Sequence, residues 1–293
     1  MDSFTELPVP RDLTKIFESA ELIPWRSFRE SDDSRYVSLC LPRVLMRLPH
    51  GPDTVPVEGL DFREATDGED HEKYLWGGPA YVLAERVAAA FSKYGWTAAI
   101  RGVEGGGKVG GMPTHTFVTV DGDIAAKCPT EVAITDRREK ELDDLGFIAL
   151  LKCKNTDDAA SFGGATANQP KRYNTNRANA NSKLSSMLPC ILNSSRFAHY
   201  VKVMMRDNTG SFLTEDDVPD YLTTWIGPYV LAKDNAGQSL KAQYPLREAR
   251  VDVMAVPGRP GVYQAVIFLR PHFQMEELST SIRLVAELPP AAA

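Results

Sequence analysis

The segment most similar to a known ligand-binding motif is the glycine-rich loop Gly102-Val-Glu-Gly-Gly-Gly107-Lys108. Glycine-rich loops that end in lysine bind phosphate, with the lysine contacting the β- and γ-phosphates. The next position normally carries the hydroxyl that holds Mg²⁺, but here it is Val109. Such a loop should also open a helix, whereas Gly110, Gly111 and a strand pattern follow. We therefore expect a flexible loop, and a P-loop-like nucleotide-binding enzyme that uses residues 102–108 is the alternative.

Cysteine and histidine are the other residues that could carry chemistry. His115, Cys128 and Cys153 are candidate zinc ligands, but the chain contains no C-x-x-C or H-x-x-x-H spacing. Cys190 and His199 are separated by a helical rise of ~13 Å, too far for a nucleophile and its base. No G-x-S-x-G nucleophile motif occurs. We therefore expect no catalytic residue, no metal site and no cofactor.

The composition is typical of a globular protein. The chain has 293 residues, of which 43% are hydrophobic and 25% charged, enough for one large domain or two ordinary ones. Its net charge is −6 and no basic block stands out, which argues against nucleic acid as a partner. No apolar run approaches the ~20 residues that span a bilayer, and the N-terminus does not have the pattern of a secretory signal. With scattered cysteines, these features predict a cytoplasmic protein with reduced thiols.

The first part of the chain is predicted to be a layered α/β unit. Helices are expected at Pro79–Tyr94 and Arg137–Leu145, and strands at Trp96–Ile100, His115–Val120 and Phe147–Cys153. The second helix opens with a capping-box pattern from Asp136 to Glu139. Strand, helix and strand in this order indicate an α/β arrangement. Residues 155–175 are then rich in Asn, Gly, Gln and Pro, and we expect a domain boundary or an exposed loop there.

The second part is predicted to be two helices followed by a β-meander, an α+β unit. Arg177–Arg206 shows helical spacing of apolar residues, with a kink or break at Pro189. Carboxylates after Thr214 open another helix at its positive end. Three strands then follow between Arg250 and Leu288. We therefore divide the chain into domains 1–175 and 176–293.

The last strand is the candidate functional site. From Leu278 to Leu288 the chain alternates with the period of a half-buried strand. One face carries Leu278, Thr280, Ile282, Leu284, Ala286 and Leu288, and the other carries Ser279, Ser281, Arg283, Val285 and Glu287. A strand at an edge leaves unpaired N–H and C=O groups, to which a strand of a neighbouring subunit can add. We expect strand exchange between subunits of an assembly, with these partner-binding residues: Val262, Val266, Phe268, Leu278, Thr280, Ile282, Leu284, Ala286 and Leu288.

Long motifs run along the chain in a fixed order. The longest is Cys128-Pro-Thr-Glu-Val-Ala-Ile-Thr-Asp-Arg-Arg-Glu-Lys-Glu-Leu-Asp-Asp-Leu-Gly-Phe-Ile148. The others are Trp25-Arg-Ser-Phe-Arg-Glu-Ser, Leu41-Pro-Arg-Val-Leu, Tyr94-Gly-Trp-Thr-Ala-Ala-Ile-Arg-Gly-Val-Glu-Gly-Gly-Gly107, Cys153-Lys-Asn-Thr-Asp157, Ser195-Arg-Phe-Ala-His-Tyr200, Tyr244-Pro-Leu-Arg-Glu-Ala-Arg250 and Leu269-Arg-Pro-His-Phe-Gln274. Together they resemble the large sheath subunit of bacterial type VI secretion systems, the TssC/VipB family, over nearly the whole chain.

The resemblance implies a phage-tail-sheath-like protein whose C-terminal domain is similar to the baseplate wedge protein. It implies a structural subunit, not an enzyme, that polymerises with the small sheath subunit TssB/VipA and with copies of itself around the Hcp inner tube. Contraction would propel that tube, and the baseplate wedge protein would be a further partner. Family members are longer at the N-terminus, so we expect no contact with the ATPase ClpV here. A baseplate adaptor of the same apparatus is a second alternative.

Overall fold

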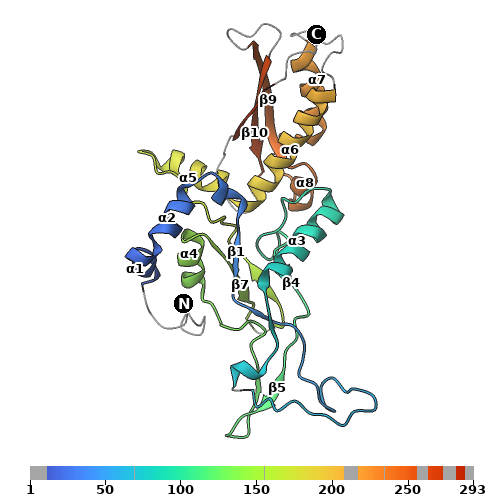
Figure 1. Ribbon diagram of the computed structural model, residues 1–293. Helices are drawn as coiled ribbons and strands as arrows, with labels where there is room; N and C mark the ends of the chain where they lie inside the picture. Colours follow the sequence, from blue (N-terminus) through green and yellow to red (C-terminus); the bar gives the residue numbers. More distant parts are fainter. Residues whose placement is uncertain are drawn as a thin grey trace. The chain divides into compact units, whose positions relative to one another are not determined.

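The computed structural model describes residues 12–68, 70–154, 156–207, 217–233, 235–255, 263–272 and 282–287. The chain divides into two compact units. Unit 1 comprises Met1–Val87 and Ile100–Gln169, and unit 2 comprises Ala88–Ala99 and Pro170–Ala293. Helix α3 (Pro79–Tyr94), in cyan in Figure 1, begins in unit 1 and ends in unit 2. The division into domains 1–175 and 176–293 stays a prediction.

Unit 1 is built on a four-stranded sheet of order β1-β7-β8-β4. Strands β1 (Leu39–Leu41) and β7 (Phe147–Lys152) are parallel, and β8 (Ala159–Ser161) and β4 (Lys108–Val109) continue the sheet in antiparallel pairs. The four inner residues of β7 are buried, which confirms the buried strand that its apolar run predicts. A strand covered on both faces needs apolar side chains at successive positions rather than at alternate ones.

Helix α4 (Asp136–Asp144) packs against β7 in unit 1. Its N-cap is Thr135, whose hydroxyl accepts a hydrogen bond from the Arg138 N–H, so the helix begins one residue before the predicted Arg137. Gly146 follows the helix with a φ of +87°, a conformation that glycine adopts without strain. Leu142 and Leu145 pack into a core with Leu41, Val132, Ile134, Ala149, Leu151 and Leu13.

The other elements of unit 1 are short. Helices α1 (Leu13–Phe17) and α2 (Ile23–Glu30) precede β1. Two small antiparallel pairs join β2 (Val44–Leu45) to β3 (Trp76–Gly77) and β5 (Thr116–Val118) to β6 (Ile124–Ala126). Single 3₁₀ turns lie at Ala20–Leu22, Asp33–Tyr36, His71–Lys73 and, in unit 2, Gly227–Tyr229.

The strand predicted at Trp96–Ile100 is wrong, because these residues have no regular secondary structure. Trp96 is buried through ring contacts, stacking on Phe197 with 4.5 Å between ring centres. Apolar residues in this segment therefore mark core contacts of an irregular chain and not a strand.

Unit 2 contains a three-stranded antiparallel sheet of order β11-β10-β9. Its strands are β9 (Leu246–Ala255), β10 (Tyr263–Pro271) and β11 (Ile282–Glu287). Its helices are α5 (Asn176–Ser185), α6 (Leu188–Asp207), α7 (Asp217–Ile226) and α8 (Gln238–Gln243). Pro189 lies in the first turn of α6, where its missing N–H costs nothing, so the predicted interruption is a break between α5 and α6.

The core of unit 2 lies between these helices and the sheet. Helices α6 and α7 and strands β9 and β10 contribute buried residues, together with Trp96: Phe197, Val201, Met205, Val218, Leu222, Ile226, Leu246, Ala265, Ile267 and Leu269. Both units therefore combine helices with open sheets, which confirms the mixed α+β class. No helix in the described part of the chain has the length and apolar composition needed to cross a bilayer. The likeness to the baseplate wedge protein stays a prediction.

Candidate functional site

The antiparallel sheet of unit 2 contains the predicted docking strands. Strand β10, in red in Figure 1, is the middle strand, and it pairs with β9 over its whole length and with β11 from Gln264 to Leu269. Backbone groups of β10 are therefore occupied on both sides. A strand from another subunit can add only at the outer edge of β11 or of β9. The edge of β9 is partly covered at its start, where Val230 forms a bridge with Leu246.

One face of this sheet belongs to the core. Ala265, Ile267 and Leu269 of β10 are each at most 2% exposed. By register, Ala286, Leu284 and Ile282 of β11 lie directly opposite them. Residues directly opposite each other in an antiparallel pair share a face. The alternation predicted for the last strand thus places Ile282, Leu284 and Ala286 at the register positions of the core.

The other face of the sheet carries charge. Arg250 places its guanidinium 4.4 Å from the centre of the Phe268 ring, and Arg270 lies 3.3 Å from Glu248. A hollow of about 130 Å³ lies among Glu248, Arg250, Phe268, Leu269 and Arg270. Antiparallel sheets commonly have one face on the core and one toward solvent.

The predicted docking residues are distributed between these two faces. Val266 and Phe268 share the charged face by register, although Val266 is 1% exposed and Phe268 is half-buried. Val262, Leu278, Thr280 and Leu288 lie outside the described residues. The structure thus brings Val266, Phe268, Ile282, Leu284 and Ala286 into one sheet, and their role in docking stays a prediction.

The glycine-rich loop does not form a phosphate site in this structure. Lys108 lies in β4, and its Nζ is 2.6 Å from Asp158 Oδ2. This ion pair raises the pKa of Lys108, mainly through the hydrogen bond with Asp158. The amide of Gly102 donates to the carbonyl of Ser161 at 2.7 Å, and that of Gly107 donates to the carbonyl of Gly102 at 2.8 Å. These amides and the lysine are therefore already engaged within the fold.

Close packing explains the glycine at position 107. A Cβ atom there would lie 2.6 Å from the Ser161 carbonyl oxygen, a distance that real Cβ atoms do not show. The Ser161 amide also donates to the Gly107 carbonyl, so the loop and β8 run in direct backbone contact. Glycine is thus required for backbone approach and not for phosphate.

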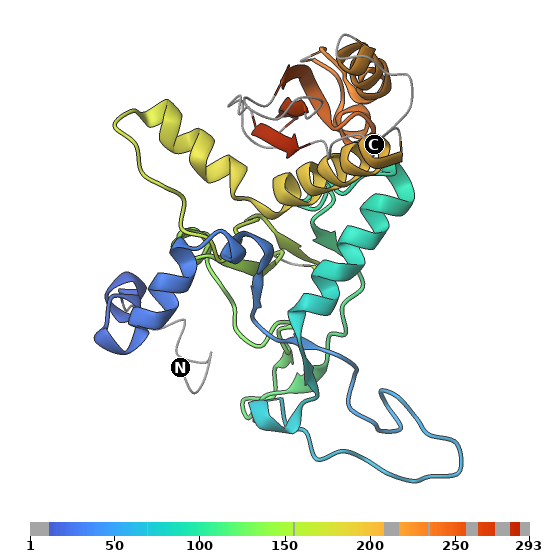
Figure 2. The same cartoon turned by 45° about the horizontal axis from the view of Figure 1, so that its top comes forward.

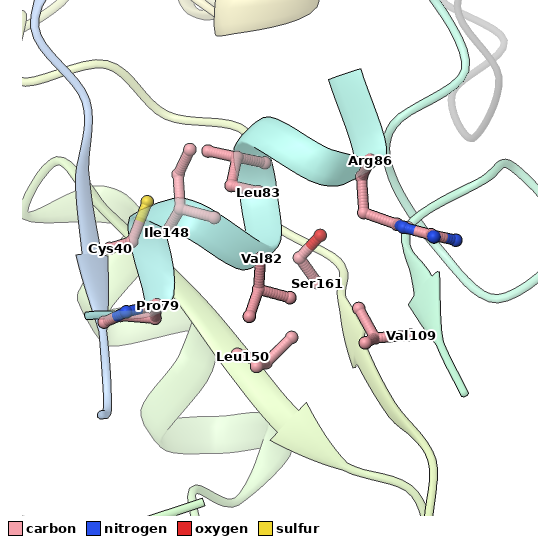
Figure 3. A pocket seen from close by; sticks show the side chains of 10 residues that line it. Cys40, Pro79, Val82, Leu83, Arg86, Val109, Ile148, Leu150 and Ser161 are labelled. Carbon is pink, nitrogen blue, oxygen red and sulfur yellow. The ribbon is translucent and has the colours of Figure 1, made fainter. Parts of the chain in front are cut away.

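A small apolar pocket lies beside this loop in unit 1 (Figure 3). Val82 and Leu83 from α3 face Val109, Ile148 and Leu150 from the sheet. The cavity volume is about 10 Å³, which at most admits one water molecule. A pocket of this size is a packing gap and does not admit a nucleotide or another small substrate.

Two of the four cysteines, Cys40 and Cys190, are poor candidates for reactive thiols. Burial raises the pKa of Cys40 to about 11 and that of Cys190 to about 12. Both thiols therefore stay protonated at neutral pH and are poor nucleophiles. Within the described ranges, no three His, Cys, Asp or Glu side chains come together to hold a metal ion.

Replacing Lys108 with alanine tests the glycine-rich loop. We expect no change in nucleotide binding measured by calorimetry with Mg²⁺-ATP, because Lys108 is paired with Asp158 within the fold. The free energy of unfolding should change little, since the lysine side chain is 46% exposed and ion pairs at exposed side chains contribute little to stability. Micromolar, Mg²⁺-dependent ATP binding that disappears in the variant would contradict this account.

Two family models match the chain over most of its length. Residues 1–168 match the tail sheath N-terminal domain of the EvpB/VC_A0108 family, and residues 177–288 match its tail sheath gpW/gp25-like domain. This chain belongs to the EvpB/VC_A0108 tail sheath family. The resemblance to the TssC/VipB sheath subunit that the sequence motifs indicated is thereby confirmed.

A curated relative of this tail sheath family member is the type VI secretion system sheath protein TssC1 of Pseudomonas aeruginosa. The two are 49% identical over 292 residues, which is 99% of this chain and 59% of TssC1. The chain therefore spans about three-fifths of the length of the curated relative it matches. The gpW/gp25-like match begins at the second residue of α5 and includes α6 to α8 and all three strands of the unit 2 sheet.

Proposed function

We propose that this chain is a structural subunit of the contractile sheath of a type VI secretion system. The observation that carries the proposal is the 49% identity to the sheath protein TssC1 over 99% of the chain. In this role it polymerises in the cytoplasm with the small sheath subunit TssB/VipA and with further copies of itself around the Hcp inner tube. Contraction of that polymer propels the tube, and no step requires catalysis by this chain.

Features of unit 2 support an assembly role. An open helical polymer needs heterologous contacts, in which one surface of a subunit meets a different surface of the next. The outer edge of β11 is suited to such a contact, because backbone hydrogen bonds give directional and repeatable linkage. We propose that a strand of a neighbouring subunit adds there, and that the baseplate wedge protein uses the same edge.

Negative-stain imaging of the chain coexpressed with the small sheath subunit tests the proposed function. Tubes of regular diameter that contain both proteins are the expected result. Each protein expressed alone provides the control for non-specific aggregation. Separate, monodisperse proteins without tubes would overturn the role of this chain as a sheath subunit.

Two proline substitutions in β11 test the docking edge. Successive N–H groups of a strand point to opposite sides, and proline has no N–H. One of the two variants Leu284→Pro and Val285→Pro therefore removes a donor that faces β10, and the other removes a donor at the outer edge. We expect both variants to abolish tube formation, whereas the variant at the β10-facing donor should also lose more stability by circular dichroism. Normal tubes from the variant that keeps the β10 pairing would exclude strand addition at this edge.

A further inference from the structure

Charge is distributed unevenly along this chain. Residues 159–206 contain no Asp or Glu, whereas they contain seven basic residues: Lys171, Arg172, Arg177, Lys183, Arg196, Lys202 and Arg206. Residues 53–72 contain eight Asp or Glu residues and a single lysine or arginine, Arg63. We call residues 171–177 the basic segment and residues 53–72 the acidic loop. The two have opposite local charge in one and the same chain.

The basic segment presents its charges to solvent in a defined conformation. All of its residues are exposed, and Lys171, Arg172 and Arg177 form no ion pair with any described residue. Tyr173, 52% exposed, is anchored by its amide, which donates to the Asn179 side chain at 2.6 Å. The segment leads into α5, which is shown in yellow in Figure 2 and is capped by the Thr175 hydroxyl. Arginine and tyrosine are enriched in protein–protein interfaces, and this segment exposes two arginines and a tyrosine.

The first part of the acidic loop, residues 53–64, is anchored at its base by an ion pair and exposes its tip. Arg47 and Glu64 form a bidentate ion pair with N···O distances of 2.9 Å and 2.6 Å, and Glu64 also accepts from the His50 amide. Beyond this base, the Leu60 amide donates to the Val57 carbonyl in a turn. Gly59, with a φ of +76°, provides the left-handed residue that this turn requires. The loop, in blue, extends away from the unit 1 sheet in Figures 1 and 2.

The tip of the acidic loop combines charge with apolar surface. Glu58 and Asp61 are exposed, and neither forms an ion pair with a described residue. Between and beside them, Val57 is 41% exposed, Leu60 57% and Phe62 49%. Large apolar side chains on a projecting loop, interleaved with free carboxylates, form a surface that complements cations and an aromatic ring.

We propose that the basic segment of one copy of this chain binds the acidic loop of a second copy. The exposed cations of the first pair with the free carboxylates of the second, and Tyr173 packs on the apolar tip around Leu60 and Phe62. The contact joins two different surfaces and is therefore heterologous, as an open polymer requires. It rests on the proposed function, because it supplies one of the contacts between copies in the sheath.

Zero-length cross-linking of the purified full chain tests the contact directly. A carbodiimide joins lysine amines to carboxylates that touch them, and mixing ¹⁴N- and ¹⁵N-labelled protein separates links between copies from links within one chain. We expect mixed-isotope peptides that join Lys171 to Glu58 or Asp61, and fewer of them at 0.5 M salt because of screening, where the Debye length is below ~8 Å. The proposal would be overturned if these cross-links were absent, or if every cross-linked peptide pair carried a single nitrogen isotope.

Charge reversal gives the second test. One variant carries Lys171→Glu, Arg172→Glu and Arg177→Glu, and the other carries Glu58→Lys, Asp61→Lys and Glu72→Lys. In sedimentation velocity each variant alone should associate about tenfold or more weakly than the wild type, because like charges then face each other. An equimolar mixture of the two should regain association, since each reversed surface again meets its opposite charge.

A matched control variant reverses three exposed lysines elsewhere, Lys140→Glu, Lys154→Glu and Lys202→Glu, with the same change of net charge as the variant of the basic segment. It should associate like the wild type. A mixture that fails to recover, or a control that is equally impaired, would overturn the contact between the basic segment and the acidic loop. If both reversed variants form normal tubes with the small sheath subunit, this contact is rejected and the proposed function is not affected.

Discussion

Replacing Phe197 with alanine is expected to lower the stability of unit 2 by about 3–5 kcal/mol, the usual cost of deleting a fully buried aromatic ring. Phe197 is 0% exposed and lies at the centre of the unit 2 core. Its ring contacts those of Trp96, Tyr229 and Trp225, with centre-to-centre distances of 4.5 Å, 5.6 Å and 6.0 Å. Truncation leaves a cavity that three large, mutually packed rings cannot readily close.

Tryptophan fluorescence during urea unfolding measures this effect, because Trp96 and Trp225 both contact the deleted ring. Phe91→Ala is the matched control, since Phe91 is 51% exposed and its loss should change the free energy of unfolding by less than about 1 kcal/mol. Near-equal midpoints for the two variants would show that the aromatic cluster does not stabilise unit 2.

Replacing Arg43 with methionine is expected to destabilise unit 1 by about 3 kcal/mol at neutral pH, because it leaves a buried carboxylate without its charge partner. The Glu131 side chain is 2% exposed and forms a bidentate pair with Arg43, in which Arg43 Nε lies 2.9 Å from Oε2. His71 Nε2 is 3.7 Å from the same carboxylate, but burial lowers the pKa of His71, so it stays neutral at pH 7. Arg43 is thus the main charge that stabilises Glu131.

The effect of Arg43→Met should depend on pH. The hydrogen bond from Arg43 lowers the pKa of Glu131 in the folded protein below its usual value of 4.5. A carboxylate whose pKa is lower in the folded than in the unfolded protein stabilises the fold at pH values above its unfolded pKa. This contribution is lost as the pH falls through the folded pKa. In the variant the carboxylate can be protonated more easily, so the difference from the wild type should shrink below about pH 4.5.

Urea unfolding of wild type and variant at pH 7 and pH 4 measures both parts of this prediction. Arg63→Met is the matched control, because its partner Asp53 is 78% exposed and their pair should contribute about 0–1 kcal/mol. A loss of stability equal to that of the control at pH 7, or one that does not change with pH, would contradict the assigned role of the buried pair.

Local features of the fold could be predicted from the sequence. The bounds of α3 follow from Pro79 at its start and Gly95 after its end, and the break between α5 and α6 follows from Pro189. These signals act between residues a few positions apart, so they need no knowledge of the partner elements. The family could be predicted as well, because long motifs in a fixed order distinguish it from other folds.

Contacts between distant parts of the chain were decided only by the tertiary structure. Lys108 pairs with Asp158, and Arg43 pairs with Glu131 across 88 positions, and no periodicity in the sequence indicates either pair. Trp96 was misassigned to a strand for the same reason, since its burial depends on Phe197 of helix α6. The alternation from Ile282 to Ala286 predicts a strand with two different faces, but its partner β10 follows only from the packing of unit 2. Secondary-structure propensity and hydrophobic periodicity act within one helix or strand. The pairing of strands and side chains depends instead on which elements bury their apolar faces against each other.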